Sequence, residues 1–366
     1  MPVPGGLTPR QQSGRPWQVY QAASRLGEVH VIDLPEVSRY WRRMANTAGR
    51  HLRTGMSPDR PAYLLRQYRE QIHPTLLDHR NDLILSPSTL PVAMLPSAPV
   101  PVAVWTDAPF PALVDHYDEY RSSPRVRRWG LQIETAALGR ADVSAFPSSW
   151  PCEAARSLAP ASRIERITFG PNMPREVITE VRRRRNRQGP QPGLILFIGY
   201  DFVRKGGDLA VETVERVRER VGKHVQLIVI GANPLRYSER PFIHLCGPVD
   251  VTTAQGLEMM IDYLAKASVL LLPTRAETFG AVIAEAASCG IPVVVSDTDG
   301  AGEAVQRGGF GYAVTKGEAE VEKLANAVST LLSNQEIYRI MSRAGISASE
   351  DWLNYDSGLR HLLTLI

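Results

Sequence analysis

Two glutamates, Glu277 and Glu285, stand eight positions apart and are suited to contact different ends of one extended ligand. An apolar run ends at Pro273, a polar loop follows, and a helix is predicted to begin at Phe279 or Gly280. Loops at the carboxyl ends of parallel strands bind ligands in open α/β sheets, and the N–H groups of a helix start suit a phosphate. Taken alone, the pattern also fits a helix with an acidic first turn and a partly buried glutamate about two turns along it.

The segment Ile198–Glu212 (IGYDFVRKGGDLAVE) carries a second candidate site, with Arg204 and Lys205 beside a predicted strand end. Paired cations at such a place suit a diphosphate, because arginine offers a bidentate fork and lysine a point charge. The segment is not a P-loop, since G-x-x-x-x-G-K-[ST] is absent, and it lacks the dinucleotide fingerprint G-x-G-x-x-G. A surface loop that is merely basic is the alternative.

Short apolar runs alternate with helix-like segments along the chain, which favours parallel sheets covered by helices on both faces. Strands are predicted over Val29–Leu34, Asp82–Ser86, Val100–Trp105, Val143–Pro147, Ile164–Phe169, Leu194–Gly199, Val225–Gly231, Ile243–Cys246, Val269–Pro273, Pro292–Ser296 and Gly311–Val314. Helices are predicted over Pro16–Leu26, Val37–Arg53, Pro61–Arg80, Ala112–Arg121, Arg125–Gly139, Pro151–Leu158, Gly207–Val221, Ala254–Ala265, Phe279–Ser288 and Glu318–Ser333. The fold class is therefore α/β, with two doubly wound, Rossmann-like domains.

The boundary between the domains is predicted at a charged, glycine- and proline-rich stretch. The arginine run Arg182–Arg187 and the following Gln188–Gly193 are typical of a solvated linker. A nucleic-acid patch is disfavoured, because no aromatic side chains interleave the arginines. We expect an N-terminal domain over residues 1–188, a C-terminal domain over 189–345, and a helical tail over 346–366 that packs back toward the first domain.

The start of the chain lacks the apolar run expected for the first strand of a doubly wound domain. Residues Met1–Gly14 hold only Val3 and Leu7 as aliphatic side chains. Either the true start lies upstream of this sequence, or the first domain has lost that strand.

The composition excludes several classes of protein. The chain has 366 residues, 43% of them hydrophobic and 22% charged, which are ordinary values for a globular protein of two domains. No apolar run approaches the roughly 20 residues that span a bilayer, and the start has no signal-peptide h-region. Three scattered cysteines fit a reducing compartment, so we expect a cytoplasmic location. A net charge of +4 is nearly neutral and gives no argument for nucleic acid.

The two candidate loops together resemble the donor half of the retaining GT-B glycosyltransferases of the family-4 type (glycosyl transferases group 1). The spacing of Glu277 and Glu285 matches the E-x7-E element of that family, and Ile198–Glu212 is similar to its cationic diphosphate loop. Val229–Pro234 (VIGANP) and Gly290–Gly300 (GIPVVVSDTDG) come in the expected order. The resemblance implies a cleft between two domains, with the nucleotide sugar on the second and the acceptor on the first.

The resemblance extends into the first half of the chain and so covers most of it. Segments there that are similar to those of the family are Ser13–Leu34, Val102–Phe110, Ala141–Ala155 and Ile167–Pro174. By this resemblance Gly14 would approach the donor phosphates. Many relatives have a histidine on the N-terminal side of the cleft, where this chain has Thr106-Asp107. Asp107 is therefore the candidate catalytic residue on that side.

Further roles follow from the same resemblance. Arg204 and Lys205 would hold the diphosphate and neutralise the leaving group. Glu285 would accept hydrogen bonds from the ribose hydroxyls, and Glu277 would grip the transferred sugar. The remaining predicted donor-binding residues are Gly231, Asn233, Pro234, Thr278, Phe279, Gly280 and Ala281.

One departure from the family pattern bears on metal binding. The usual Gly-Gly near the second cleft loop is Asp299-Gly300 here, which creates Asp297-Thr298-Asp299. A D-x-D holds a metal with the sugar nucleotide in a different glycosyltransferase fold. Its position after the E-x7-E helix argues against that role, because the cationic loop already neutralises the diphosphate. We expect no metal and no other cofactor.

The function that these observations favour is a retaining, metal-independent glycosyltransferase. We expect a GDP- or UDP-linked sugar as donor, a hydroxyl or thiol of a small molecule as acceptor, and front-face transfer, because no second carboxylate is placed as a nucleophile. Antibiotic or thiol-sugar biosynthesis is one pathway in which such an enzyme could act, although no particular residue indicates it.

Two alternatives stay open. A lipid-directed enzyme would use the basic stretch Arg39–Arg53, with Tyr40 and Trp41, as its membrane contact. A non-catalytic protein that binds sugar nucleotides would keep the same loops. The presence of all four charged residues of these loops, Arg204, Lys205, Glu277 and Glu285, argues against loss of activity.

Overall fold

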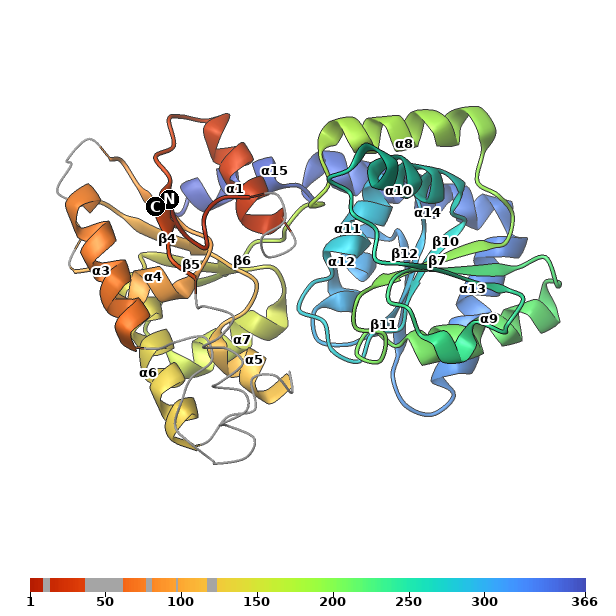
Figure 1. The fold of residues 1–366 in the computed structure, drawn as a ribbon, viewed down its shortest axis with the longest axis horizontal. Helices are drawn as coiled ribbons and strands as arrows, with labels where there is room; N and C mark the ends of the chain where they lie inside the picture. The colour runs from red at the N-terminus through yellow and green to blue at the C-terminus, as the bar shows by residue number, and fades with distance from the viewer. Residues whose placement is uncertain (9–13, 37–61, 77–80, 97, 117–123) are drawn as a thin grey trace. The chain divides into compact units, whose positions relative to one another are not determined.

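The computed structural model describes residues 1–8, 14–36, 62–76, 81–96, 98–116 and 124–366 (Figure 1). The chain divides into two compact units. Unit 1 comprises Met1–Thr168 and Tyr355–Ile366, and unit 2 comprises Phe169–Asn354. The helix predicted over Val37–Arg53 lies outside the described residues, and so does the basic stretch proposed as a membrane contact.

Unit 2 is built on one parallel sheet of six strands in the order β12-β11-β10-β7-β8-β9. The strands are β7 (Leu194–Gly199), β8 (Gln226–Gly231), β9 (Ile243–Gly247), β10 (Val269–Leu272), β11 (Val293–Asp297) and β12 (Gly311–Thr315). The central strands are continuous apolar runs, VLLL in β10 and VVV at the start of β11, because helices bury both of their faces. All six strands were predicted, each within two residues of its observed ends.

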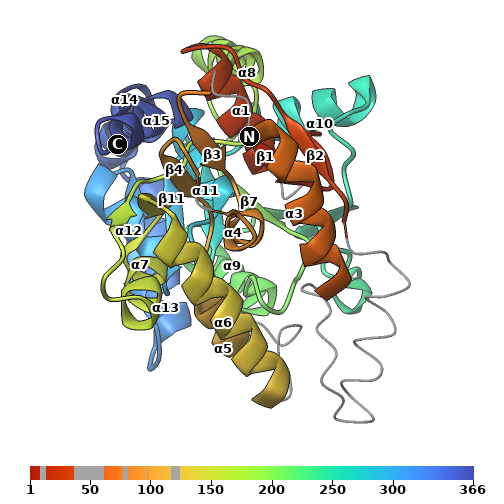
Figure 2. The same ribbon diagram turned by 90° about the vertical axis from the view of Figure 1, so that its left-hand side faces the viewer.

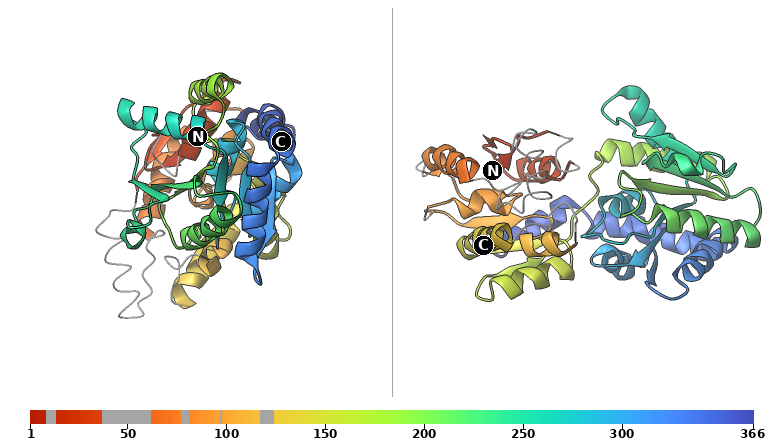
Figure 3. Two further views of the ribbon diagram at one scale, coloured as in Figure 1. Left: turned by 90° about the vertical axis from the view of Figure 1, so that its right-hand side faces the viewer. Right: turned by 60° about the horizontal axis from the view of Figure 1, so that its bottom comes forward.

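Helices cover both faces of this sheet. On one face α9 and α13 lie side by side, and the other carries α8, α10, α11 and α14 (Figures 1 and 3). Their bounds are α8 (Arg175–Gln188), α9 (Gly207–Arg220), α10 (Ala254–Lys266), α11 (Ala281–Ser288), α12 (Ala301–Gly308), α13 (Glu320–Ser333) and α14 (Gln335–Asp351), with a short 3-10 helix η3 (Leu235–Tyr237) after β8.

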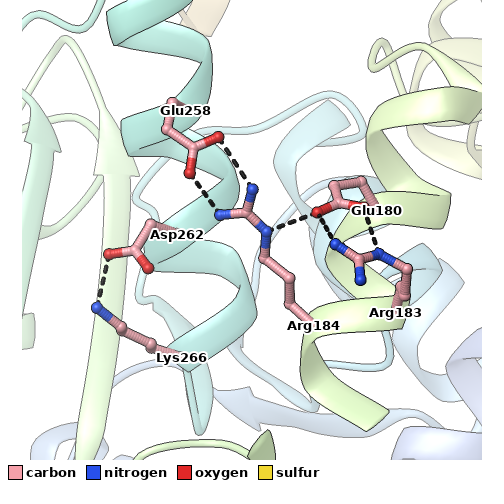
Figure 4. Close-up of polar contacts among 6 residues, drawn as sticks. All are labelled: Glu180, Arg183, Arg184, Glu258, Asp262 and Lys266. Atoms are coloured by element: carbon pink, nitrogen blue, oxygen red, sulfur yellow. Dashed lines mark hydrogen bonds and ion pairs between the residues drawn. The ribbon is translucent and has the colours of Figure 1, made fainter. Parts of the chain in front are cut away.

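The arginine run predicted as a linker is in fact part of helix α8 of unit 2. Arg184 of α8 donates to both carboxylate oxygens of Glu258 on α10, at 2.6 and 3.0 Å, and to Glu180 one turn earlier at 2.7 Å (Figure 4). These ion pairs tie α8 to α10, where Lys266 also pairs with Asp262 at 2.7 Å. The linker prediction was wrong for residues 182–188, because the charges are used within the unit.

Arg185 shows why α8 belongs to unit 2. Its guanidinium donates to the carbonyl oxygens of Leu264, Ala265 and Ala267 at the end of α10, at 3.0, 3.1 and 2.7 Å. It also donates to the carbonyl of Gly290 at 3.1 Å. Cations stabilise helix C-termini, where the last carbonyls lack partners. The first boundary between the units therefore falls at 168/169 rather than at 188/189.

Unit 1 contains a four-stranded parallel sheet and a separate parallel pair. The larger sheet runs in the order β3 (Ile84–Ser86), β4 (Val102–Trp105), β5 (Val143–Phe146) and β6 (Ile164–Arg166), and the pair consists of β1 (Pro2–Pro4) and β2 (Ile32–Leu34). The prediction that the first strand is missing was wrong. Strand β1 is three residues long with only Val3 as an aliphatic side chain, fully buried opposite Asp33, which is too short for a visible apolar run.

The helices of unit 1 pack around these strands. They are α1 (Arg15–Ser24), α3 (Ala62–Leu76), α4 (Thr89–Ala93), α5 (Phe110–His116), α6 (Pro124–Arg140), α7 (Ser149–Leu158) and α15 (Tyr355–Leu363). The main core joins α3, α4 and α6 to β3 and β4, and these helices stand in front in Figure 2.

The last helix, α15, returns to unit 1 after α14 has ended in unit 2. Its Tyr355 ring lies 5.6 Å from the ring of the buried Trp105, and Arg25, directly after α1, donates to Asp356 at 2.9 and 2.5 Å. The second boundary therefore falls at 354/355, whereas the sequence suggested a tail from residue 346. Among the described helices none is long and apolar enough to cross a membrane.

Candidate functional site

The loops with the predicted catalytic residues of unit 2 follow two neighbouring strands, β7 and β10. The sheet order changes direction between these strands, because β8 and β9 lie to one side and β11 and β12 to the other. Such a switch point is where open α/β sheets bind ligands, at the carboxyl ends of the strands. The fold thus brings Arg204, Lys205 and Glu277 to one edge.

Lys205 and Glu277 form an ion pair across the two loops. The ammonium of Lys205 donates to Oε2 of Glu277, and the two side chains are only 13% and 11% exposed. Glycine at 199 leaves room for the lysine stem, since a Cβ there would lie 2.9 Å from its Cγ. Low exposure strengthens the attraction relative to a surface pair, so the pair is a fixed element of the site.

Arg204 links the same two loops through its side chain and its backbone. Its guanidinium donates to the carbonyl of Ala276 at 3.0 Å, and its Nε lies 3.4 Å from Asp201. Its own carbonyl accepts from the N–H of Arg275 at 2.8 Å. The paired cations therefore belong to a hydrogen-bonded arrangement rather than to a merely basic surface loop.

Arg275 is a residue of this arrangement that the sequence reading missed. It forms a bidentate pair with Asp208 at the start of α9, both contacts at 2.7 Å, and donates to the carbonyl of Val203 at 2.6 Å. The guanidinium lowers the pKa of Asp208, and the carboxylate raises the pKa of Arg275. An arginine two positions before Glu277 was the available signal, but its partner lies 67 residues away in sequence.

Gly206 permits the closest approach of the two loops. Its φ is +73°, and a Cβ would lie 1.7 Å from the carbonyl oxygen of Pro273. Both facts require glycine at this position.

Helix α11 begins one residue later than the later of the two predicted positions. Its first residue is Ala281, and Gly280 at the N-cap has a φ of +82° and offers no side-chain cap. Thr278 and Phe279 are buried, and the Phe279 ring packs edge-on against Phe169 at 5.8 Å. The loop therefore presents the positive end of α11 beside Glu277, which suits a phosphate group.

Glu285 lies on α11, its fifth residue and little more than one turn from the start rather than the two turns expected. Its carboxylate accepts a hydrogen bond from the backbone N–H of Asn172. Burial raises the pKa of Glu285 to about 7, against the opposing effect of that hydrogen bond. The residue is therefore a titratable carboxyl near neutral pH.

The residues predicted after β8 lie next to the loop after β7. Gly231 has a φ of +97°, and a Cβ there would lie 2.8 Å from the carbonyl oxygen of Gly199. Asn233 and Pro234 follow, and the carbonyl of Pro234 accepts from the N–H of Tyr237 at 2.9 Å to start η3.

The two carboxylates of the D-x-D segment bind different groups. Asp297 accepts from the amide of Gln306 at 3.0 Å, whereas Asp299 accepts from the backbone N–H of Glu277 at 3.2 Å. Within the part of the chain that the structure describes, no cluster of three or more His, Cys, Asp or Glu side chains is arranged to hold a metal.

In unit 1, the predicted residues Gly14 and Asp107 lie near a third residue, Arg15. Gly14 is the N-cap of α1 with a φ of +84°, and Asp107 follows β4. The Arg15 guanidinium lies 3.9 Å from the Asp107 carboxylate and donates to the carbonyl of Pro87 at 3.4 Å. Arg15 is 12% exposed and Asp107 45%. Sequence reasoning missed Arg15, although it directly follows Gly14.

Comparison with known proteins matches residues 192–334 to the family described as Glycosyl transferases group 1. Unit 2 is therefore similar to glycosyl transferases group 1 over most of its length. The match includes Arg204, Lys205, Glu277 and Glu285, the residues from which the resemblance was first drawn.

Curated proteins that are similar to this chain match over part of their length. A GDP-mannose-dependent alpha-(1-6)-phosphatidylinositol monomannoside mannosyltransferase of Mycobacterium tuberculosis is 29% identical over 219 residues, covering 56% of this chain and 56% of that protein. A D-inositol 3-phosphate glycosyltransferase of Xylanimonas cellulosilytica is 33% identical over 142 residues, covering 36% of this chain and 33% of that protein. The chain thus spans about half or less of the length of these curated relatives.

Solved structures extend the comparison of fold to unit 1. HepE of Anabaena, solved in complex with UDP, superposes with a TM-score of 0.66 at 14% sequence identity, covering 100% of this chain and 99% of that chain. Units 1 and 2 together therefore have the GT-B fold, as the sequence predicted.

Proposed function

We propose that the protein is a retaining glycosyltransferase that moves a sugar from a nucleotide-diphosphate sugar to a hydroxyl or thiol of a small molecule. The observation that carries this proposal is the ion pair of Lys205 and Glu277, with Arg204 beside it, at the switch point of the unit 2 sheet. Two cations and a helix N-terminus suit a diphosphate, and a carboxylate suits sugar hydroxyls. A nucleotide sugar carries both of these groups, a diphosphate and sugar hydroxyls.

The proposed division of roles follows from charge. Arg204 and Lys205 hold the diphosphate and stabilise the negative charge that grows on it as it departs. Glu277 accepts hydrogen bonds from hydroxyls of the transferred sugar, and Lys205 orients its carboxylate. Glu285 accepts from the ribose hydroxyls. These cations meet the charge of the diphosphate, so we propose that no metal ion is needed.

The proposed chemical step is front-face transfer. The bond from the anomeric carbon to the diphosphate oxygen breaks, and the acceptor oxygen or sulfur forms its bond to the same face of that carbon. The acceptor proton passes to the departing phosphate oxygen. The products are a glycoside with the anomeric configuration of the donor and a nucleoside diphosphate.

A donor screen followed by product analysis tests this proposal. UDP-, GDP-, ADP- and TDP-sugars are offered in a thermal-shift assay, where a ligand at 100 times its dissociation constant stabilises by roughly 2.7 kcal/mol. The stabilising donor is then incubated with an acceptor pool, and proton NMR reads the anomeric configuration of the product. We expect a UDP- or GDP-sugar to stabilise the protein and the configuration to be retained. An inverted product contradicts the mechanism, and binding without hydrolysis or transfer supports a non-catalytic binding protein.

A lipid-directed glycosyltransferase is the second candidate, favoured by one helix of unit 1 and one relative. Helix α6 exposes Arg125, Arg128 and Trp129 on its first turns, a combination that suits an anionic membrane surface. The Mycobacterium relative is named for a phosphatidylinositol mannoside substrate. Salt-sensitive binding to vesicles with phosphatidylglycerol, lost when Arg125 and Arg128 become glutamine, favours this candidate. Absence of binding at low salt excludes it.

We also propose a cytoplasmic location, because nucleotide sugars are cytoplasmic substrates. Fluorescence of a tagged chain in fractionated cells checks it. Detection of the protein with the membrane fraction at low salt favours the lipid-directed candidate instead.

A further inference from the structure

Asp299 occupies a backbone conformation that normally selects glycine. Its φ is +50°, and among the described non-glycine residues only Ala319 shares a positive φ, at +59°. A side chain in this left-handed region is sterically disfavoured, although aspartate and asparagine tolerate it better than most residues because they bond locally. A strained residue beside a candidate active site calls for a compensating contact.

The compensating contact is made to the backbone of Glu277. The Asp299 carboxylate accepts from the N–H of Glu277 at 3.2 Å, and the N–H of Gly300 donates to the carbonyl of Glu277 at 3.0 Å. Both backbone groups of Glu277 are therefore bound by two successive residues from the loop after β11. Lys205 holds its side chain.

These contacts restrict both the backbone and the side chain of Glu277. Glu277 itself is 8% exposed, and the Gly300 that follows Asp299 is also buried. Backbone and side chain are bound from two different loops, those after β7 and β11, which flank β10 on either side. A glycine at 299 would accept the φ but would leave the N–H of Glu277 without its carboxylate partner.

We propose that Asp299 is a positioning residue: its carboxylate fixes the backbone of Glu277 so that the Glu277 side chain meets Lys205 and the transferred sugar. The proposal rests on the proposed function for its effect on catalysis. Its effect on the loop itself does not depend on any donor.

Three variants separate the hydrogen bond from the backbone conformation. Asp299→Asn keeps both an oxygen acceptor and tolerance of positive φ. Asp299→Gly keeps only the tolerance of φ. Ala319→Gly is the matched control, because it places glycine at the other left-handed residue, at the N-cap of α13.

The kinetic expectation follows from misplacement of a catalytic group. Asp299→Gly lowers kcat/KM for the donor sugar roughly 10-fold to 100-fold, with most of the loss in kcat, because the transition state needs Glu277 more precisely than binding does. Asp299→Asn stays within about threefold of the wild type, since a neutral acceptor forms a slightly weaker bond. Equal losses in both variants would show that the charge contacts the substrate directly and would overturn the positioning role.

A measurement without substrate keeps the two proposals distinguishable. Hydrogen exchange of the peptide over residues 273–281 is compared among the four proteins at equal folded fraction. We expect faster exchange at Glu277 in Asp299→Gly only. Unchanged exchange in that variant overturns the inference, whatever the activity. Failure of the wild type to bind or turn over any nucleotide sugar overturns the proposed function instead, and the exchange result still decides whether Asp299 fixes the loop.

Discussion

The carboxyl ends of the two sheets carry candidate site residues that are held to different degrees. In unit 2 the strands are four to six residues long, and Arg204, Lys205 and Glu277 are all bonded across loops. In unit 1 the strands are three or four residues long. Asp107 there is nearly half exposed and lies 3.9 Å from Arg15.

The difference matches the two halves of the proposed reaction. Every nucleotide-diphosphate sugar presents the same diphosphate to the donor side, so a rigid set of partners gains by preorganisation. An acceptor side needs groups that suit one particular molecule. The match to the group 1 family over residues 192–334 lies entirely in unit 2, which agrees with a common donor-binding design.

Glu277→Ala provides the strongest test of this comparison. We expect kcat/KM to fall about 100-fold or more for both transfer and donor hydrolysis, because a transition-state contact is lost. Asp107→Ala should lower transfer about tenfold, as the loss of one hydrogen bond from a charged group to the acceptor would, and leave donor hydrolysis unchanged. Steady-state kinetics with and without acceptor checks both. Glu219→Ala, which removes an exposed carboxylate of α9, is the control. Equal effects of the two active-site variants on hydrolysis would contradict the division of roles.

Gly206→Ala tests how tightly the unit 2 loops are packed. The added Cβ would overlap the carbonyl of Pro273, so we expect a free energy of unfolding about 2 kcal/mol lower than that of Gly309→Ala. Gly309 is the matched control, since it also has a positive φ, +62°, but nothing lies within 4 Å of an added Cβ. Urea unfolding measures both. Equal losses would mean that the loops separate easily and that the rigidity argued for unit 2 is absent.

The sequence was sufficient to predict the six strands of unit 2 and the meeting of Arg204, Lys205 and Glu277. Apolar runs mark buried parallel strands, and the resemblance placed both loops at the same edge. Two residues of unit 2 whose contacts it missed, Arg275 and Asp299, have partners 67 and 22 positions away in sequence. Their residue types alone do not reveal such partners, and Asp299 drew attention only as part of a D-x-D.

The errors in the predicted fold arose where local sequence patterns pointed to one structure and tertiary contacts stabilise another. An arginine run is typical of a solvated segment, yet Arg185 caps the end of α10 and so makes α8 part of unit 2. Strand β1 is held by pairing with β2 and by burial of Val3, neither of which a three-residue stretch can show. In both cases the structure depends on contacts with residues that are distant in sequence.

The raised pKa of Glu285 predicts that the stability of unit 2 depends on pH. Its pKa is raised from 4.5 to about 7 in the folded chain, so the folded state binds more protons than the unfolded state between these values. Stability is therefore greatest below pH 4.5 as far as this group is concerned, and falls as pH rises to 7, by about 1 kcal/mol per pH unit. Glu285→Gln should abolish this slope. Urea unfolding from pH 5 to pH 8 checks it, and an unchanged slope contradicts the assignment.

Replacement of Arg15 is expected to have the smallest effect on transfer activity, and it tests the candidate residues of unit 1. Its guanidinium orients Asp107 at 3.9 Å and also bonds the carbonyl of Pro87, so the contact to Asp107 is weak and half-exposed. Arg15→Gln should lower transfer roughly fivefold, within the range of one weakened charge contact. Arg15→Lys, which keeps the charge, should recover most of that loss.

The double variant Arg15→Gln with Asp107→Ala decides whether Arg15 acts through Asp107. If it does, the double variant should be no slower than Asp107→Ala alone, because coupled residues are not additive. Additive losses would show that Arg15 contacts the acceptor independently. A loss as large as that of Glu277→Ala would show that the edge of unit 1 is as strictly organised as that of unit 2, and would contradict the contrast between the two units.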